Sequence, residues 1–169
     1  LILAEELVRT QAFKECVDER GFIEDLNKSI VYTEQREFEY NNNPEPAKET
    51  RLTQTSQYQR SKKVSSNALL KARFLCEVNT EHPVFVRKNS NENYTEPHHL
   101  VPLFAQKDFP DVNLDREQNI VSLCSHCHNL LHYGADIDGV LYKLYMDRKD
   151  LLQLIGIEIS YEDLRKYYL

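Results

Sequence analysis

Histidines and cysteines gather in one part of this chain. Five of its six histidines and two of its four cysteines lie between residues 96 and 132. They stand in two segments, EPHHLVP (residues 96–102) and NIVSLCSHCHNLLH (residues 119–132). Imidazole and thiolate groups are ligands for zinc and related cations, and imidazole also accepts protons near neutral pH. This concentration predicts a metal-dependent site rather than a merely packed domain.

The spacing of the histidines predicts a division of roles. His128 and His132 are four residues apart on a predicted helix, so they project from one face. His98 and His99 are neighbours on a predicted strand and should point to opposite sides of it. We therefore expect His98, His128 and His132 to bind a divalent cation while His99 acts on water from the other side. A histidine-rich set of ligands suits Zn, Ni, Co or Mn better than a set made only of oxygens would.

Over about residues 70–135 the chain resembles the HNH endonucleases. His99 matches the general base of that family, and His98 matches the metal ligand before it. Asn119 matches the central Asn that helps fix the base and its loop. His128 matches the last ligand of the motif, and His132 matches an additional histidine found in many members. The Cys76-x5-His82 spacing and the Asp-Gly-Val-Leu-Tyr segment at residues 138–142 look like the bacterial restriction-type branch related to McrA.

The resemblance implies a fold, a reaction and a partner. The fold would be α+β, a ββα-metal (His-Me finger) HNH core flanked by helices at both ends. The reaction would be metal-dependent hydrolysis of DNA phosphodiester bonds to 5′-phosphate and 3′-hydroxyl ends, in restriction of, or defence against, foreign or modified DNA. Mg is also common as the cation in this family. An HNH core cleaves one strand per site, so a homodimer could supply the second cut. The apolar stripe of the N-terminal region could form that interface, or equally pack within the chain.

Local patterns predict the elements that would position these side chains. Three strands are expected, at Pro83–Val86, Tyr94–Val101 and Ile120–Leu123. Helices are expected at 4–20, from Ser65 or Ser66 to Phe74, at Cys127–Tyr133, at Asp147–Ile155 before Gly156, and from a capping box at Ser160. Tyr142–Tyr145 fits either a strand or a helix start, and Asp108–Asn119 reads as a loop.

A second metal site is expected beside the first. Cys124-x2-Cys127 has zinc-knuckle spacing and needs two further ligands. Cys76 and His82 are the best candidates. His126 is the alternative, but it is held between the two cysteines, and Cys16 fits better as a small packed side chain. This structural zinc would also hold His128 in place, since Cys127 directly precedes it. Glu96, two residues before His98 on the same strand face, could support a histidine by a hydrogen bond or be an ordinary strand residue.

Composition sets the domain organisation and the compartment. The 169 residues suit one domain, or a small domain with a helical appendage. We expect a helical N-terminal region and arm at 1–63, the tail of a longer protein, and a nuclease domain at 64–169. With no apolar run long enough for a bilayer and no signal-peptide pattern, we expect no membrane association and a cytoplasmic location.

Charge is unevenly distributed. The net charge is −6, yet residues 48–73 hold seven basic residues against one acidic residue. Such a stripe fits contact with DNA phosphates, and a solvated linker would look similar. The candidate contacts with the DNA backbone are Arg60, Lys62, Lys63, Lys71 and Arg73. A non-catalytic zinc module that binds nucleic acid or protein, and an HNH nuclease of repair or mobile elements, remain alternatives.

Overall fold

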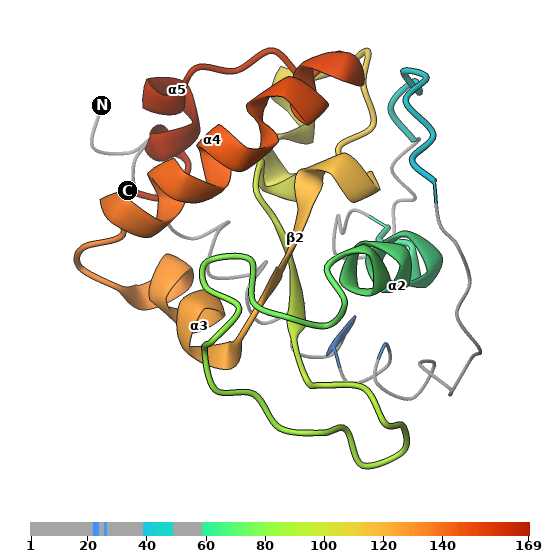
Figure 1. The fold of residues 1–169 in the computed structure, drawn as a ribbon. Coiled ribbons are helices and arrows are strands. Elements are labelled where there is room, and N and C mark those ends of the chain that lie inside the picture. Colours follow the sequence, from blue (N-terminus) through green and yellow to red (C-terminus); the bar gives the residue numbers. More distant parts are fainter. Residues whose placement is uncertain (1–21, 24–25, 27–38, 49–58) are drawn as a thin grey trace, which may run out of the picture.

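The computed structural model describes residues 22–23, 26, 39–48 and 59–169 (Figure 1). The helix predicted at 4–20, which contains Cys16, lies outside the described residues. The described part combines helices with a small antiparallel sheet, which agrees with the expected α+β class. Within it, no helix is long and apolar enough to cross a membrane.

Two strands form the sheet. β1 (Glu96–His99) pairs with β2 (Ile120–Leu123) in antiparallel register, and His99 lies opposite Ile120. All eight residues are buried, because other elements cover both faces of this short ladder. β2 has the predicted bounds, and β1 is shorter than predicted. The strand predicted at Pro83–Val86 is wrong: this segment makes one isolated bridge, between Val86 and Asn93, before the chain continues into β1.

Helix α2 (Lys62–Lys71) packs against both strands (Figure 1). It begins earlier than predicted because Ser61, not Ser65 or Ser66, caps it: the Ser61 hydroxyl accepts a hydrogen bond from the Val64 backbone N–H. Beyond the helix, Arg73 and Phe74 adopt left-handed backbone angles and turn the chain sharply. The predicted domain boundary between residues 63 and 64 falls inside α2, and the division into domains stays a prediction.

Helix α3 (Ser125–Tyr133) follows β2 after a single residue and contacts both strands. Its predicted position was correct to within two residues at the start, where Cys124 is the N-cap. This short connection fixes the direction of α3 relative to the sheet. Side chains on the first two turns of the helix are therefore brought beside β1.

Two further helices follow α3, and they lie against each other in Figure 1. α4 (Asp138–Leu154) includes Tyr142–Tyr145 as helix and starts nine residues before the predicted Asp147. Gly156 follows it with a positive φ of 86°, a conformation that glycine adopts without strain. α5 (Tyr161–Lys166) has the predicted cap, since the Ser160 hydroxyl accepts from the Asp163 backbone N–H. The buried core runs between the sheet and α3, α4 and α5, and includes Leu100, Leu123, Leu131, Leu144 and Leu164.

Candidate functional site

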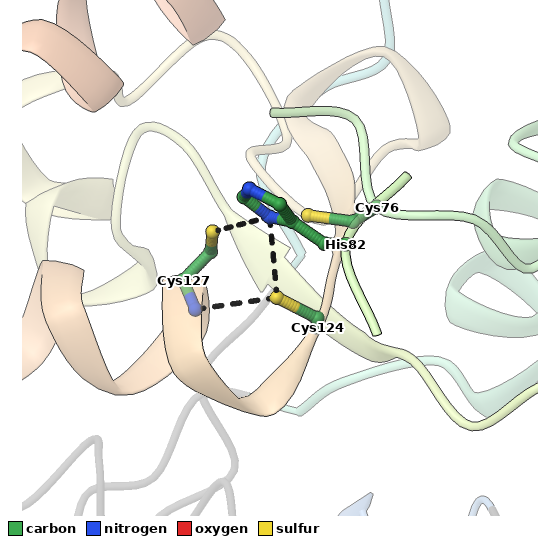
Figure 2. Close-up of side chains that lie close together, drawn as sticks. All are labelled: Cys76, His82, Cys124 and Cys127. Carbon is green, nitrogen blue, oxygen red and sulfur yellow. Dashed lines mark hydrogen bonds between the residues drawn. The ribbon is translucent and has the colours of Figure 1, made fainter. Parts of the chain in front are cut away.

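Three cysteines and one histidine form the first cluster. The ligand atoms of Cys76, His82, Cys124 and Cys127 all lie within 4.8 Å of one another. Nδ1 of His82 is 3.3 Å from Sγ of Cys127 and 3.6 Å from Sγ of Cys124. Figure 2 shows the His82 ring facing both sulfur atoms, with Cys76 beside it. This set of donors could hold a metal ion such as zinc, for which three thiolates and one imidazole form a closed tetrahedral site.

Three segments of the chain build this cluster. Cys124 and Cys127 lie at the start of α3, and the Cys127 backbone N–H donates to Sγ of Cys124. Cys76 is held beside β2 because the Glu77 backbone N–H donates to the Ser122 carbonyl at 2.9 Å. His82 comes from the loop that leads toward β1. A metal here would therefore fasten the segment after α2 to the first turn of α3.

The surroundings shift the pKa values of two of these thiols in opposite directions. Burial raises the pKa of the Cys76 thiol, but hydrogen bonds, above all from the backbone N–H groups of Cys124, Asn79 and Val78, outweigh burial and lower this pKa to about 7. Burial and the neighbouring Cys76 thiolate raise the pKa of Cys127. Repulsion between neighbouring thiolates disfavours a second charge, and a bound cation removes that repulsion.

Three histidines form a second cluster across the sheet and α3. His98 comes from β1, and His128 and His132 come from successive turns of α3. One ring nitrogen of each lies within 4.8 Å of the others. The His98 ring centre is 5.2 Å from that of His128 and 5.0 Å from that of His132. His98 and His128 are buried, and His132 is half-buried. The structure thus brings together the three side chains that the sequence grouped.

Two of these rings are oriented by side chains outside the cluster. Oε2 of Glu96 lies 2.5 Å from Nδ1 of His128, and the Ser125 hydroxyl donates to Oε1 of Glu96. Burial raises the pKa of Glu96, but the hydrogen bond from His128 and its charge outweigh burial and lower the net pKa. The Tyr168 hydroxyl donates to the Leu100 carbonyl at 2.7 Å and lies 2.9 Å from Nε2 of His98. These contacts orient the rings of His98 and His128 within the cluster.

His99 points away from this cluster. The residue is 3% exposed, and its Nε2 lies 3.0 Å from Oδ1 of Asp115. Nδ1 of His99 is buried and has no hydrogen-bond partner among the residues that the structure describes. The neighbouring side chains of β1 therefore have different surroundings, as the alternation of a strand requires. The His98 side chain belongs to the histidine cluster, and the His99 side chain forms a hydrogen bond with Asp115.

The Asn119 side chain joins the segment that follows His99 to the segment that precedes Asp115. Its side-chain oxygen accepts from the Val101 backbone N–H at 2.8 Å. Its amide donates to the carbonyls of Val101, at 2.8 Å, and Leu114, at 2.9 Å. Since Asn119 is fully buried, these bonds are shielded from water and hold the two loops in register.

Only some of the basic residues between 48 and 73 lie together on one surface in the described part of the chain. Lys62, Lys63 and Lys71 are exposed on α2, and Arg73 is exposed just after it. The Arg60 guanidinium lies over the Phe22 ring at 5.7 Å from its centre. The structure thus places a basic surface on α2, while contact with a phosphate backbone stays a prediction. His126 is exposed at the start of α3, outside both clusters.

Comparison with known proteins adds one relationship. No family model matches the chain. A segment of 90 residues is 29% identical to the type IV methyl-directed restriction enzyme EcoKMcrA of Escherichia coli (strain K12). The chain is distantly similar to McrA. The match covers 53% of this chain and 30% of the McrA enzyme, so the chain corresponds to less than a third of that protein. The similarity supports an McrA-like relationship and hints at a nuclease of the restriction type.

Two residues of the site were missed in the sequence. Asp115 lies in a segment that reads as a polar loop, and its contact with His99 spans 16 residues without a periodic pattern. Tyr168 is one of ten tyrosines, and 70 residues separate it from His98. Neither carries a local signal. Only the short spacing of Asp115 before Asn119 could have drawn attention to it.

Proposed function

We propose that this chain is a metal-dependent endonuclease of the HNH type, which hydrolyses DNA phosphodiester bonds to 5′-phosphate and 3′-hydroxyl ends. One observation carries the proposal: His98, a member of the three-histidine cluster, and His99, which contacts Asp115 instead, are neighbouring residues of β1 with different surroundings. One set of side chains can hold a cation while the other moves a proton.

His98, His128 and His132 would hold the cation. The donor set fits, because the rings lie close together and contacts with Tyr168 and Glu96 orient two of them. A divalent cation bound there would stabilise negative charge on the phosphate and on the departing 3′ oxygen. Imidazole ligands admit Zn, Ni, Co and Mn, and Mg remains a candidate.

His99 would act as the general base. Neutral imidazole accepts a proton from water while the water oxygen bonds to phosphorus. The bond from phosphorus to the 3′ oxygen then breaks, its electron pair stays on that oxygen, and solvent supplies the proton that completes the 3′-hydroxyl group. Asn119 supports this step because it holds together the two loops beside His99 and Asp115.

The cluster of Cys76, His82, Cys124 and Cys127 would hold a structural zinc. It lies at the start of α3, one residue before His128. The described core is small around the two-stranded sheet, so a metal clamp would add stability that apolar burial alone supplies poorly.

DNA restriction is the biological role that we propose. The name of the McrA enzyme describes methyl-directed restriction, and the exposed lysines of α2 suit a phosphate backbone. Cleavage of plasmids that differ only in cytosine or adenine methylation tests this role. Equal rates on all of them would argue for a nuclease of another pathway.

Plasmid cleavage tests the catalytic assignment. Supercoiled DNA is incubated with the protein and Mg²⁺, Mn²⁺, Co²⁺, Ni²⁺ or Zn²⁺, and religation by a DNA ligase reports 5′-phosphate and 3′-hydroxyl ends. We expect His99→Ala to lower the rate about 10²- to 10⁴-fold, the usual contribution of a general base. His126→Ala is the matched control, because it removes an exposed histidine outside both clusters and should leave the rate within about threefold.

Two results would count against the proposal. If His99→Ala cleaved as fast as the unaltered protein and bound the same cation, His99 would not be the base. If the unaltered protein cleaved nothing with any of the five cations yet bound zinc and DNA, the chain would be a non-catalytic zinc module.

A further inference from the structure

The Asp115 carboxylate contacts three separate segments of the chain, through two hydrogen bonds and one ion pair. Its Oδ1 lies 3.0 Å from Nε2 of His99. Its Oδ2 accepts from the Ser61 backbone N–H at 2.6 Å and lies 3.8 Å from Nζ of Lys48. The carboxylate is 2% exposed. A buried carboxylate with this many partners is held firmly in one orientation.

This orientation dictates where the proton of neutral His99 lies. An ionised carboxylate only accepts hydrogen bonds, so Nε2 of His99 must carry the hydrogen that points at Asp115. A neutral imidazole has one N–H, and its other nitrogen is then a lone-pair acceptor. That other nitrogen is Nδ1, the buried atom without a hydrogen-bond partner among the described residues.

We propose that Asp115 is a positioning residue for the reaction. It holds His99 in the Nε2–H tautomer, so that Nδ1 is the atom that takes the proton from water. This inference rests on the proposed function, because it assigns the acceptor atom of the base named there. When the water proton arrives at Nδ1, His99 becomes a cation whose remaining N–H still points at the Asp115 carboxylate.

Asp115 also has a structural contact that the experiment must separate from this role. Ser61 is the N-cap of α2, so its bond to Oδ2 ties the start of the basic helix to the loop before β2. Removal of the whole side chain would disturb both contacts. The test therefore needs a variant that keeps the hydrogen bond from the Ser61 N–H and reverses the direction of the hydrogen bond with His99.

Asp115→Asn has this property. The Ser61 N–H still needs an acceptor, so it holds the amide oxygen at the position of Oδ2. The amide NH₂ group then faces His99 and donates to Nε2, which forces the hydrogen of the ring to Nδ1. The variant has the same shape, but its base has the wrong tautomer. We expect the rate constant for cleavage to fall about 10²- to 10⁴-fold with little change in KM.

Nitrogen-15 NMR reads the tautomer directly and needs no activity. At a pH where imidazole is neutral, we expect the His99 signals to show Nε2–H in the unaltered protein and Nδ1–H in Asp115→Asn. The spectrum of His99→Ala identifies these signals by their absence. Asp111→Asn is the matched control, since it makes the same chemical change at an exposed position of the same loop and should alter neither tautomer nor rate.

The possible results separate the two proposals. A hydrogen on Nδ1 of His99 in the unaltered protein would overturn the role of Asp115, even if Asp115→Asn failed to fold. Equal cleavage rates for the unaltered protein and a folded Asp115→Asn would also overturn it, while the nuclease assignment would stand. If the unaltered protein shows Nε2–H but cleaves no DNA, the tautomer assignment stands and the proposed nuclease function is refuted.

Discussion

Nδ1 of His128 lies 2.5 Å from Oε2 of Glu96, between the first residue of β1 and the first half of α3. Glu96 lies outside the histidine cluster, and His128 is one of its three members. Carboxylates behind metal-binding imidazoles fix the tautomer and orientation of the ring and increase its basicity. Glu96 thus has the geometry of a support for a proposed metal ligand.

Glu96→Gln should weaken cation binding at the histidine cluster. We expect the dissociation constant for Mn²⁺ or Ni²⁺, measured by calorimetry, to rise about 10- to 100-fold, because His128 loses its charged partner. The zinc content of the cysteine cluster should stay constant. Glu158→Gln, at an exposed position after α4, is the control. Unchanged affinity in Glu96→Gln would show that the carboxylate is an ordinary strand residue.

Cys76→Ser should remove zinc and loosen α3. The cysteine cluster joins the segment after α2 to the N-cap of α3, so removal of a ligand should lower the thermal midpoint and weaken cation binding by the histidines. Elemental analysis of protein purified without chelator should give at least about one zinc for the unaltered chain. The His126→Ala variant should retain the same zinc content as the unaltered chain. Less than half an equivalent in the unaltered chain would refute a structural zinc.

Acidification should reduce the stability that Asp115 contributes. Burial raises the pKa of Asp115, but the hydrogen bond from His99, its charge, the Ser61 N–H and Lys48 outweigh burial and lower the net pKa. A carboxyl group with a lower pKa in the folded state stabilises the protein above its unfolded value of about 3.9. That contribution is lost as the pH falls through the lowered folded value.

Urea unfolding from neutral pH to below pH 4 measures this effect. The free energy of unfolding of the unaltered protein should exceed that of Asp115→Asn by a margin that is constant near neutral pH and shrinks on acidification below about pH 4. Asp111→Asn should follow the unaltered protein throughout. A margin that grew as the pH fell below about 4 would mean that the pKa of Asp115 is raised.

Lys62 and Lys63 should contribute to DNA affinity through phosphates alone. Their joint replacement by alanine should weaken binding to all sequences alike. The slope of log affinity against log salt should fall by about 0.9 for each phosphate that is no longer neutralised. Fluorescence anisotropy with a labelled duplex measures both. Lys149→Ala, on the exposed side of α4, is the control. An unchanged slope would mean that α2 does not face the DNA.

The parts of the structure that sequence could predict depend on local patterns. The bounds of β2, the Ser160 cap and the His128-His132 pair follow from spacing within a few residues. α2 begins before its predicted start because Ser61 is fixed by Asp115, 54 residues away. The start of α4 was missed because its first turn contains Gly139, a poor helix former.

For the candidate site too, the sequence shows the residues that have a local pattern and misses those that lack one. The two clusters of histidines and cysteines are visible in the sequence because a metal demands particular residue types at helical or knuckle spacing. The residues that orient them have no required type or spacing. A hydroxyl, a carboxylate or a backbone carbonyl can each support an imidazole, so Tyr168 and Asp115 are recognised only when the chain has folded.

The contact of Tyr168 with His98 changes what counts as the minimal unit of this site. The histidine motif finishes at His132, and a fragment cut soon after it would still contain every proposed ligand. Yet the hydroxyl that orients His98 belongs to Tyr168, which reaches it only after α4 and α5 have folded and returned the chain to the end of β1. An engineered core that keeps the motif but omits these helices would therefore contain His98 without the Tyr168 hydroxyl that orients its ring.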